Sequence, residues 1–155
     1  MTNLARSPWR CLLLVWLPLA GCSTIKLQPS AGHVILDREL AIVSNYWRPT
    51  EEDVRGLEKE MARLIGSTDS RVVGMERAKL SEYGVRYYGT VLDGRRTIVG
   101  EGTHLSQQSL EDLRQENARP GNLRLKPFGG GKLSFTVVYD AEVKRILSIE
   151  AAAPL

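Results

Sequence analysis

The sequence has little cysteine and little histidine, and its main apolar run is short. Two cysteines and two histidines occur among 155 residues. The apolar run Cys11–Leu19 has nine residues, whereas a helix that crosses a bilayer needs about 20. These shortages argue against a disulfide-stapled scaffold, a zinc cluster built on thiolates and a permanent membrane helix.

The sequence also lacks a strong charge imbalance outside its first residues. Lys and Arg number 21 and Asp and Glu number 18, but Arg6 and Arg10 precede the apolar run. Without these two, 19 basic residues face 18 acidic ones, a net charge of +1. A nucleic-acid binder needs a clustered basic surface that displaces counterions. We therefore expect no nucleic-acid partner.

The composition is that of one globular domain. Hydrophobic residues make up 43% and charged residues 25% of the chain, which is ordinary for a folded protein rather than a disordered one. A chain of this length suffices for one modest domain and is too short for two.

Residues 1–22 show three regions in the order of a bacterial signal peptide. Met1–Arg10 is basic and carries no acid, Cys11–Leu19 is apolar, and Leu19-Ala20-Gly21-Cys22 closes the segment. This tetrapeptide resembles the lipobox of bacterial lipoproteins. The resemblance implies cleavage between Gly21 and Cys22 and attachment of a diacylglycerol to the Cys22 thiol. An ordinary secretory signal whose cleavage site ends in cysteine is the alternative.

In the lipoprotein interpretation, residues 1–21 are a signal peptide and Cys22 is the lipid attachment point. Two or more acyl chains hold a protein stably to a bilayer, whereas one chain binds only marginally. In Gram-negative lipoproteins an Asp after the cysteine favours inner-membrane retention. Ser23 at this position therefore implies the periplasmic face of the outer membrane.

Residues 22–32 form a predicted lipidated tether, and residues 33–155 a predicted single domain. The tether is polar and contains Pro29 and Gly32, and its fully extended reach is about 30 Å. We therefore expect the domain to stay close to the membrane.

Thr50–Ile65 is the clearest predicted element, an amphipathic helix. Thr50 and Asp53 have the spacing of a capping box, and Gly66 supplies the stop. Apolar residues recur at spacings of three and four and line one face: Val54, Leu57, Met61, Leu64 and Ile65. Such a helix has to pack against another apolar surface.

The remaining pattern predicts mainly strands. Asp93-Gly94 is a strong two-residue hairpin signal. The predicted strands are 33–44, 84–92, 95–103, 123–125, 132–139 and 144–151. A second short helix is expected over Ser109–Asn117, capped by Ser109.

The last two predicted strands form a hairpin around Asp140. Leu133, Phe135 and Val137 alternate toward one side. Leu147 and Ile149 are expected to meet them across the pair.

The order of strand, helix and at least four further strands predicts an α+β fold. One amphipathic helix would pack on an antiparallel sheet of four to five strands, because this arrangement buries both apolar faces. The order resembles that of cystatin-like folds, in which one helix lies across a strand meander. The Gln-x-Val-x-Gly loop of cystatins is absent, so inhibition of cysteine proteases is not implied.

Residues with catalytic potential are present, but they do not form a known motif. Gly129–Lys132 lacks the upstream glycine of a phosphate-binding loop. His104 with Ser106 could support nucleophilic chemistry, yet Gly-x-Ser-x-Gly is missing. Four carboxylates could supply a glycosidase-type pair: Glu101, Glu111, Asp112 and Glu116. We expect no catalytic, cofactor or metal site.

Tyr46, Trp47, Arg48 and Tyr88 are the candidate partner-binding residues, because aromatic side chains and arginine are enriched at protein interfaces. The alternative is that these rings cover the helix and the sheet. Arg95-Arg96 beyond the hairpin turn is a small basic tip. It could touch anionic lipid or peptidoglycan, or it could be an ordinary solvated hairpin end.

The sequence therefore favours a non-enzymatic, lipid-anchored binding or accessory protein of the cell envelope. Its partner would be another envelope protein or peptidoglycan, and an inhibitor or immunity protein is one option in this class. The alternatives are a small envelope hydrolase using His104 and a carboxylate, or a structural assembly lipoprotein of an envelope machine.

Overall fold

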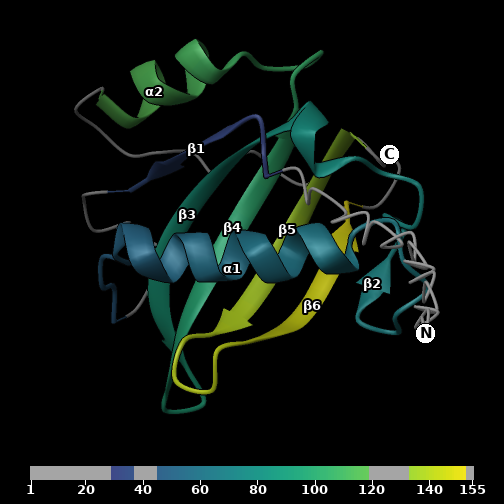
Figure 1. Cartoon of the computed structure of the whole chain (residues 1–155). Coiled ribbons are helices and arrows are strands. Elements are labelled where there is room, and N and C mark those ends of the chain that lie inside the picture. The colour runs from purple at the N-terminus through teal and green to yellow at the C-terminus, as the bar shows by residue number, and fades with distance from the viewer. Residues whose placement is uncertain (1–28, 37–44, 119–132, 153–155) are drawn as a thin grey trace, which may run out of the picture.

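The computed structural model describes residues 29–36, 45–118 and 133–152 (Figure 1). Cys22 and the predicted signal peptide lie outside the described residues. The glycine run before Lys132, the predicted strand 123–125 and most of the predicted strand 33–44 lie outside them as well.

A mixed sheet forms the centre of the described part of the chain, with strand order β1-β3-β4-β5-β6-β2. Its strands are β1 (Gly32–Ile35), β2 (Val72–Val73), β3 (Tyr83–Leu92), β4 (Arg95–His104), β5 (Ser134–Asp140) and β6 (Arg145–Ala151). Strands β3 to β6 form an antiparallel meander. The two edge strands run parallel to their neighbours, β1 to β3 and β2 to β6.

The α+β class is confirmed, but the expected antiparallel sheet of four to five strands is wrong in two respects. The described sheet has six strands, and both edge pairings are parallel. The chain crosses over from β1 through helix α1 (Glu51–Leu64) before it reaches β3, and such a crossover returns it to the same end of the sheet. Strand β2 has two residues, too few to show an alternating pattern.

Helix α1 forms where the capping pattern predicts it. The Thr50 hydroxyl accepts the Asp53 backbone N–H at 3.2 Å, and the Asp53 carboxylate accepts the Thr50 N–H at 3.1 Å. Glu51 and Glu52 add negative charge at the positive end of the helix dipole. Gly66, at φ 84°, takes the left-handed conformation that ends the helix.

Helix α1 lies across one face of the sheet and covers the main core (Figure 1). Val54, Leu57, Met61 and Leu64 are buried as predicted. The sheet contributes the buried side chains Val85, Tyr87, Ile98, Phe135, Val137 and Ile149. Gly102 makes room for Phe135, because an added Cβ would lie 2.0 Å from the Phe135 ring.

The β5–β6 hairpin confirms one predicted contact and corrects another. Ile149 lies opposite Val137 and both are buried. The pairing passes from Val138↔Ser148 to Tyr139↔Ile146, so Leu147 is the extra residue of a bulge. The bulge turns Ile146 into the core and leaves Leu147 41% exposed. The expected inward position of Leu147 is therefore wrong.

The second face of the sheet is covered at one end by helix α2 (Leu110–Ala118). The Ser109 hydroxyl accepts the Asp112 N–H at 3.1 Å, which confirms the predicted cap. Leu113 is buried, and a Cβ on Gly84 of β3 would come within 2.7 Å of it. Both faces of β3 are therefore buried.

Candidate functional site

The predicted aromatic set lies on two sides of β3. The Trp47 backbone pairs with Gly89, and its indole N–H donates to the Thr90 carbonyl at 2.9 Å. The Trp47 ring packs against the α1 core, whereas Tyr46 packs with Leu36 and Tyr88 in a smaller cluster. The structure therefore does not bring the three rings into one patch.

The exposure of these residues is also uneven. Tyr88 is 7% exposed, Tyr46 and Trp47 are half-buried, and Arg48 is exposed. The Arg96 guanidinium stacks over the Trp47 ring at 3.9 Å from its centroid, a cation–π contact. Trp47 thus braces the β3–β4 hairpin.

Glu58 is a buried carboxylate of α1 that the sequence reasoning missed. It accepts hydrogen bonds from the Ser30 hydroxyl at 2.5 Å and the Tyr87 hydroxyl at 3.3 Å. His33 Nδ1 lies 3.2 Å from the same carboxylate, and His33 Nε2 lies 3.1 Å from Glu51. The available signal was positional, because residue 58 lies between Leu57 and Met61 on the buried side of the helix.

The pKa shifts around Glu58 describe an ion pair. Burial alone would raise the pKa of Glu58, but hydrogen bonds from His33 and Ser30 outweigh it and the pKa lies below its usual value. The hydrogen bond to Glu58 raises the pKa of His33 against the opposing effect of burial. Ser30 and His33 both contact the Glu58 carboxylate, so these contacts fasten the segment around β1 to α1.

A row of polar side chains crosses the second face of the sheet. Arg86 of β3, Glu101 of β4 and Thr136 of β5 stand opposite one another in the strand register. The Arg86 guanidinium is 2.7 Å from the Glu116 carboxylate of α2 and 4.0 Å from that of Glu101. Burial raises the pKa of Glu101, although Arg86 and the Tyr88 hydroxyl favour its charged form.

Within the part of the chain that the structure describes, three buried polar atoms of this region have no hydrogen-bond partner. They are Arg86 Nε, Thr136 Oγ1 and Asn117 Oδ1. An unpaired buried polar atom costs about 1–3 kcal/mol. Arg86 and Glu101 of this row are held by the ion pairs of Arg86.

The four carboxylates considered as a glycosidase-type pair have different surroundings. Glu101 and Glu116 both contact the guanidinium of Arg86, at 4.0 and 2.7 Å. Asp112 is engaged in the cap of α2, and Glu111 accepts a hydrogen bond from Gln115 on the exposed side of the helix.

His104 and Ser106 do lie together, at the end of β4. His104 Nδ1 accepts the Ser106 backbone N–H at 3.2 Å and contacts the Ser106 hydroxyl at 2.8 Å. His104 Nε2 lies 3.7 Å from the Glu82 carboxylate. His104 thus lies between a serine and a carboxylate, but Nδ1 faces Ser106 and Nε2 faces Glu82, the reverse of the usual hydrolase triad. Ser106 is exposed.

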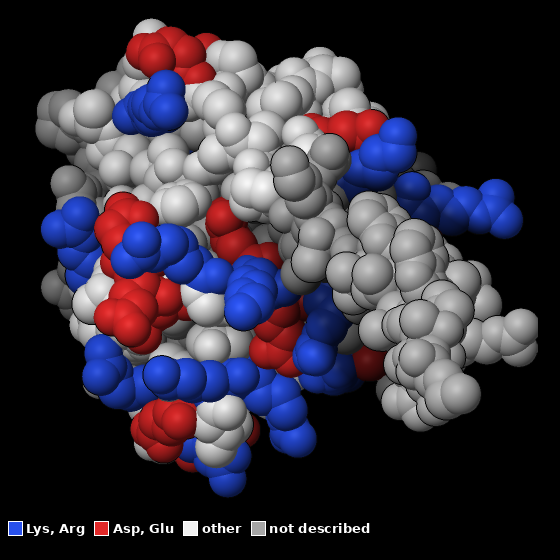
Figure 2. Space-filling view, in the orientation of Figure 1, with Lys and Arg blue, Asp and Glu red and all other residues white. Residues whose placement is uncertain are grey.

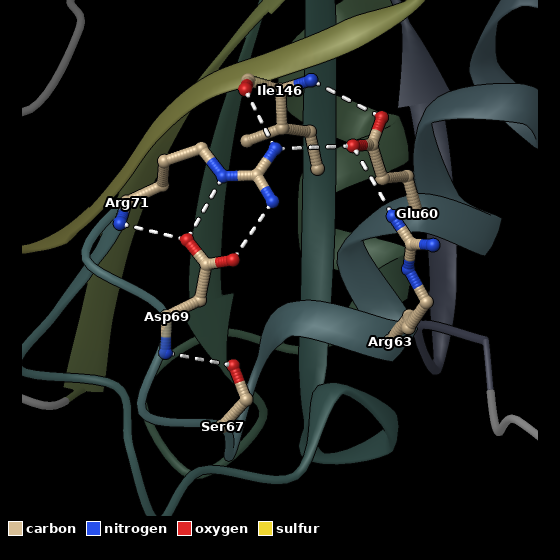
Figure 3. Close-up of polar contacts among 6 residues, drawn as sticks. All are labelled: Glu60, Arg63, Ser67, Asp69, Arg71 and Ile146. Carbon is tan, nitrogen blue, oxygen red and sulfur yellow. Dashed lines mark hydrogen bonds and ion pairs between the residues drawn. The ribbon is translucent and has the colours of Figure 1, made fainter.

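Where the short strand β2 does not cover β6, side chains occupy the backbone groups of Ile146 (Figure 3). The Glu60 carboxylate accepts the Ile146 N–H at 3.1 Å, and the Arg71 guanidinium donates to the Ile146 carbonyl at 3.3 Å. Asp69 holds Arg71 through a 2.8 Å ion pair. Occupied edge groups are a common protection against pairing with another strand, so strand addition at Ile146 is disfavoured.

The turns of the two hairpins lie together at one end of the sheet (Figure 1), and we call this surface the hairpin end. It comprises residues 92–96 and 141–145. The Ala141 N–H donates to the Arg96 carbonyl at 2.9 Å, and the Glu142 carboxylate accepts the Arg96 N–H at 3.3 Å. The predicted basic tip, Arg95-Arg96, is thus joined to a second turn.

The hairpin end mixes basic, acidic and apolar side chains. Its exposed basic residues are Arg95, Arg96, Lys144 and Arg145, and its exposed acids are Asp93 and Glu142. Leu92 is 46% and Val143 59% exposed. In the space-filling view from the α1 side, the lower part of the molecule shows blue, red and white atoms side by side (Figure 2).

Comparison with protein-family models, with curated proteins and with solved structures gave no match. Among residues 29–36, 45–118 and 133–152, no helix is long and apolar enough to cross a bilayer. The same residues contain no group of three or more acidic, histidine or cysteine side chains placed to hold a metal ion.

Proposed function

We propose that this chain is a lipid-anchored protein of the bacterial envelope that acts by binding a partner. Its attachment point is Cys22, and its location is the periplasmic face of the outer membrane. The observation that carries the proposal is the sequence of residues 19–22, which follows a basic segment and a short apolar run. That order is typical of an exported precursor.

The described domain supports a binding role more than a catalytic one. Glu58, Glu101 and Glu116 are each engaged by a cation from the same domain. The meander β3–β6 with α1 across it also supports a cystatin-like arrangement, which we propose for the central part of the domain. Within the binding class, an inhibitor or immunity protein remains our more specific proposal.

Metabolic labelling with an alkyne fatty acid tests the anchor. In a Gram-negative host, the wild-type chain should carry the label at the size of the cleaved protein, and Cys22→Ser should remain an unlabelled precursor. Cys11→Ser is the matched control and should be labelled like the wild type, because Cys11 leaves with the signal peptide. Label on Cys22→Ser, or its absence from the wild type, would contradict the proposal.

The variant Ser23→Asp tests which of the two membranes holds the protein. The wild-type protein should sediment with outer-membrane markers in a density gradient, and the variant should move to the inner-membrane fraction. If the wild-type protein and the variant both sedimented with the inner membrane, the proposed transfer to the outer membrane would be contradicted.

A small hydrolase is the second candidate, because His104 contacts the Ser106 hydroxyl on one side and lies 3.7 Å from the Glu82 carboxylate on the other. A fluorophosphonate probe would label an activated Ser106. Ser106→Ala should abolish the label, while Ser148→Ala, on β6, should keep it. An unlabelled wild-type protein that also fails to hydrolyse p-nitrophenyl acetate would remove this candidate.

A further inference from the structure

His33 of β1 lies between two carboxylates of helix α1. Its Nε2 atom is 3.1 Å from the carboxylate of Glu51, and its Nδ1 atom is 3.2 Å from that of Glu58. A neutral imidazole has one N–H group and one lone pair, so it can donate to only one of these carboxylates, whereas the imidazolium can donate to both. The observed contacts are therefore those of a charged histidine.

Strand β3 and helix α2 also pack against β1. The Tyr87 ring of β3 meets the His33 ring edge-on, with the ring centroids 5.8 Å apart, and burial raises the pKa of Tyr87 so that its hydroxyl stays neutral. Helix α2 meets β1 on the other face of the sheet, through the Leu110 side chain at Gly32. The charged groups that face His33 in the described part of the chain are therefore the two carboxylates of α1.

The two ends of β1 are held by different kinds of contact. At its start, the Ser30 hydroxyl donates to Glu58 at 2.5 Å, and the Ala31 N–H donates to the Tyr83 carbonyl at 3.0 Å. At and just beyond its end, three apolar side chains are buried: Val34, Ile35 and Leu36. Apolar burial does not depend on the charge of a histidine, so a change of that charge acts on the start of the strand.

We propose that His33 is a pH-dependent latch on the start of β1. With the imidazole charged, residues 30–33 are tied to α1 through both carboxylates. With the imidazole neutral, one carboxylate faces a lone pair and the attraction of the charges is lost. Residues 30–33 then open more often, while residues 34–36 stay in place.

The direction of the switch follows from the surroundings of His33. The hydrogen bond to Glu58 raises the pKa of His33 above 6.5, against the opposing effect of burial. The pKa of Glu58 is lowered, so this carboxylate stays charged where the histidine titrates. The latch is therefore closed in mildly acidic solution and opens as the pH rises through the folded pKa of His33.

The latch would also change the length of the tether, a step that rests on Cys22 as the anchor proposed above. Residues 30–32 belong to the predicted tether, yet the structure holds them against α1 and β3. Opening frees them together with His33, and four residues add about 13 Å of reach. The domain would then move farther from the membrane at high pH than at low pH.

Hydrogen exchange of single backbone amides, followed by NMR on the purified full chain in detergent micelles, tests the latch. After correction for the intrinsic effect of pH on exchange, the opening of the Ala31 N–H should increase about two- to fivefold between pH 5.5 and pH 8.5, the range expected for a partly exposed ion pair. The Leu36 N–H, which donates to the Tyr87 carbonyl at 2.9 Å, is the internal control and should not respond. No response at Ala31, or an equal response at Leu36, would overturn the proposal.

Variants test whether His33 is the group that titrates. His33→Gln should abolish the pH response of Ala31, and His104→Gln, at the other of the two histidines, is the matched control and should respond like the wild type. Glu51→Gln changes a side chain that is 68% exposed, so it leaves the core undisturbed, and the NMR titration of the His33 ring should move to lower pH. A response that survives in His33→Gln, or an unmoved titration in Glu51→Gln, would contradict the latch.

The outcomes separate this inference from the lipid anchor. If Cys22 is labelled and Ala31 does not respond to pH, the latch is wrong and the anchor stands. If Ala31 responds but Cys22 carries no lipid, the latch stands and its effect on the tether is wrong.

Discussion

The two faces of the sheet are both buried near β3, but they are built from different chemistry. On the α1 side, Val85 and Tyr87 join an apolar core. On the α2 side, Arg86 and Tyr88 of the same strand meet the carboxylates of Glu101 and Glu116. Successive residues of one strand therefore enter opposite environments.

The two faces therefore differ in how strictly their residues are constrained. Apolar burial is non-directional and tolerates changes that conserve volume. A buried ion pair requires both partners, because one charge left alone in the interior is costly. We therefore expect the α1 face to tolerate conservative substitution and the α2 face to respond to the loss of a single partner.

Leu57→Asp should have the largest effect. Leu57 lies on the buried side of α1 and is fully buried in the main core. A charge there would lose the apolar contacts and remain unpaired. We expect a loss above about 4 kcal/mol, enough to unfold the domain. Circular dichroism during heating measures it. Leu57→Met should cost less than about 1.5 kcal/mol, and an unchanged melting curve for Leu57→Asp would show that the helix does not pack there.

Arg86→Met should be the next most damaging change. It removes the cation between Glu101 and Glu116, and breaking a buried pair in this way costs about 3–5 kcal/mol. Urea unfolding at pH 7 measures the loss. Adding Glu101→Gln should restore part of the stability, since one of the stranded charges is then gone. If the two changes are simply additive, Arg86 and Glu101 are not coupled.

Local patterns in the sequence predict the elements well. The capping box at Thr50, the left-handed Asp93-Gly94 turn and the cap at Ser109 are all decided by residues within a few positions of one another. The buried face of α1 can also be predicted from local sequence, because its apolar residues repeat with the period of a helix.

Features that depend on pairing between distant segments could not be predicted in the same way. The row of Arg86, Glu101 and Thr136 exists only once β3, β4 and β5 are in register. The bulge at Leu147 changes which side chains of β6 face inward. Similarly, the sequence predicts Arg95-Arg96 as a basic tip, but the contact of this tip with the second turn depends on the pairing of β4 and β5.

Glu58→Gln should have a pH-dependent effect of intermediate size. Glu58 is the charged exception on the α1 face, and its amide analogue keeps the shape but loses the attraction to His33. Because His33 is only partly buried, we expect a loss of about 1–2 kcal/mol at most. The wild-type protein and the variant should be compared by urea unfolding between pH 4 and pH 8.

The sign of the pH dependence follows from the two pKa shifts. The lowered pKa of Glu58 contributes stability above its unfolded value of 4.5 that is lost as the pH falls through the folded value. The raised pKa of His33 contributes stability below 6.5 that is lost as the pH rises through the folded value. The difference between the two proteins should therefore peak between pH 4.5 and 6.5, and a constant difference up to pH 8 would contradict the ion pair.

The smallest effect should come from the two helix caps, which test whether the faces unfold together. Thr50→Ala and Ser109→Ala remove equivalent capping hydrogen bonds, each contributing about 1 kcal/mol. Helix α1 covers the main core, so Thr50→Ala should lower the midpoint of global unfolding.

Helix α2 buries little beyond Leu113, so Ser109→Ala should mainly speed hydrogen exchange within α2 and leave the midpoint nearly unchanged. Regions that open without global unfolding respond in this way. If both variants instead lower the midpoint equally, α2 belongs to the same cooperative unit as the core. The ion pairs of Arg86 would then couple the two faces, and their polar chemistry would be as important for folding as the apolar face beneath α1.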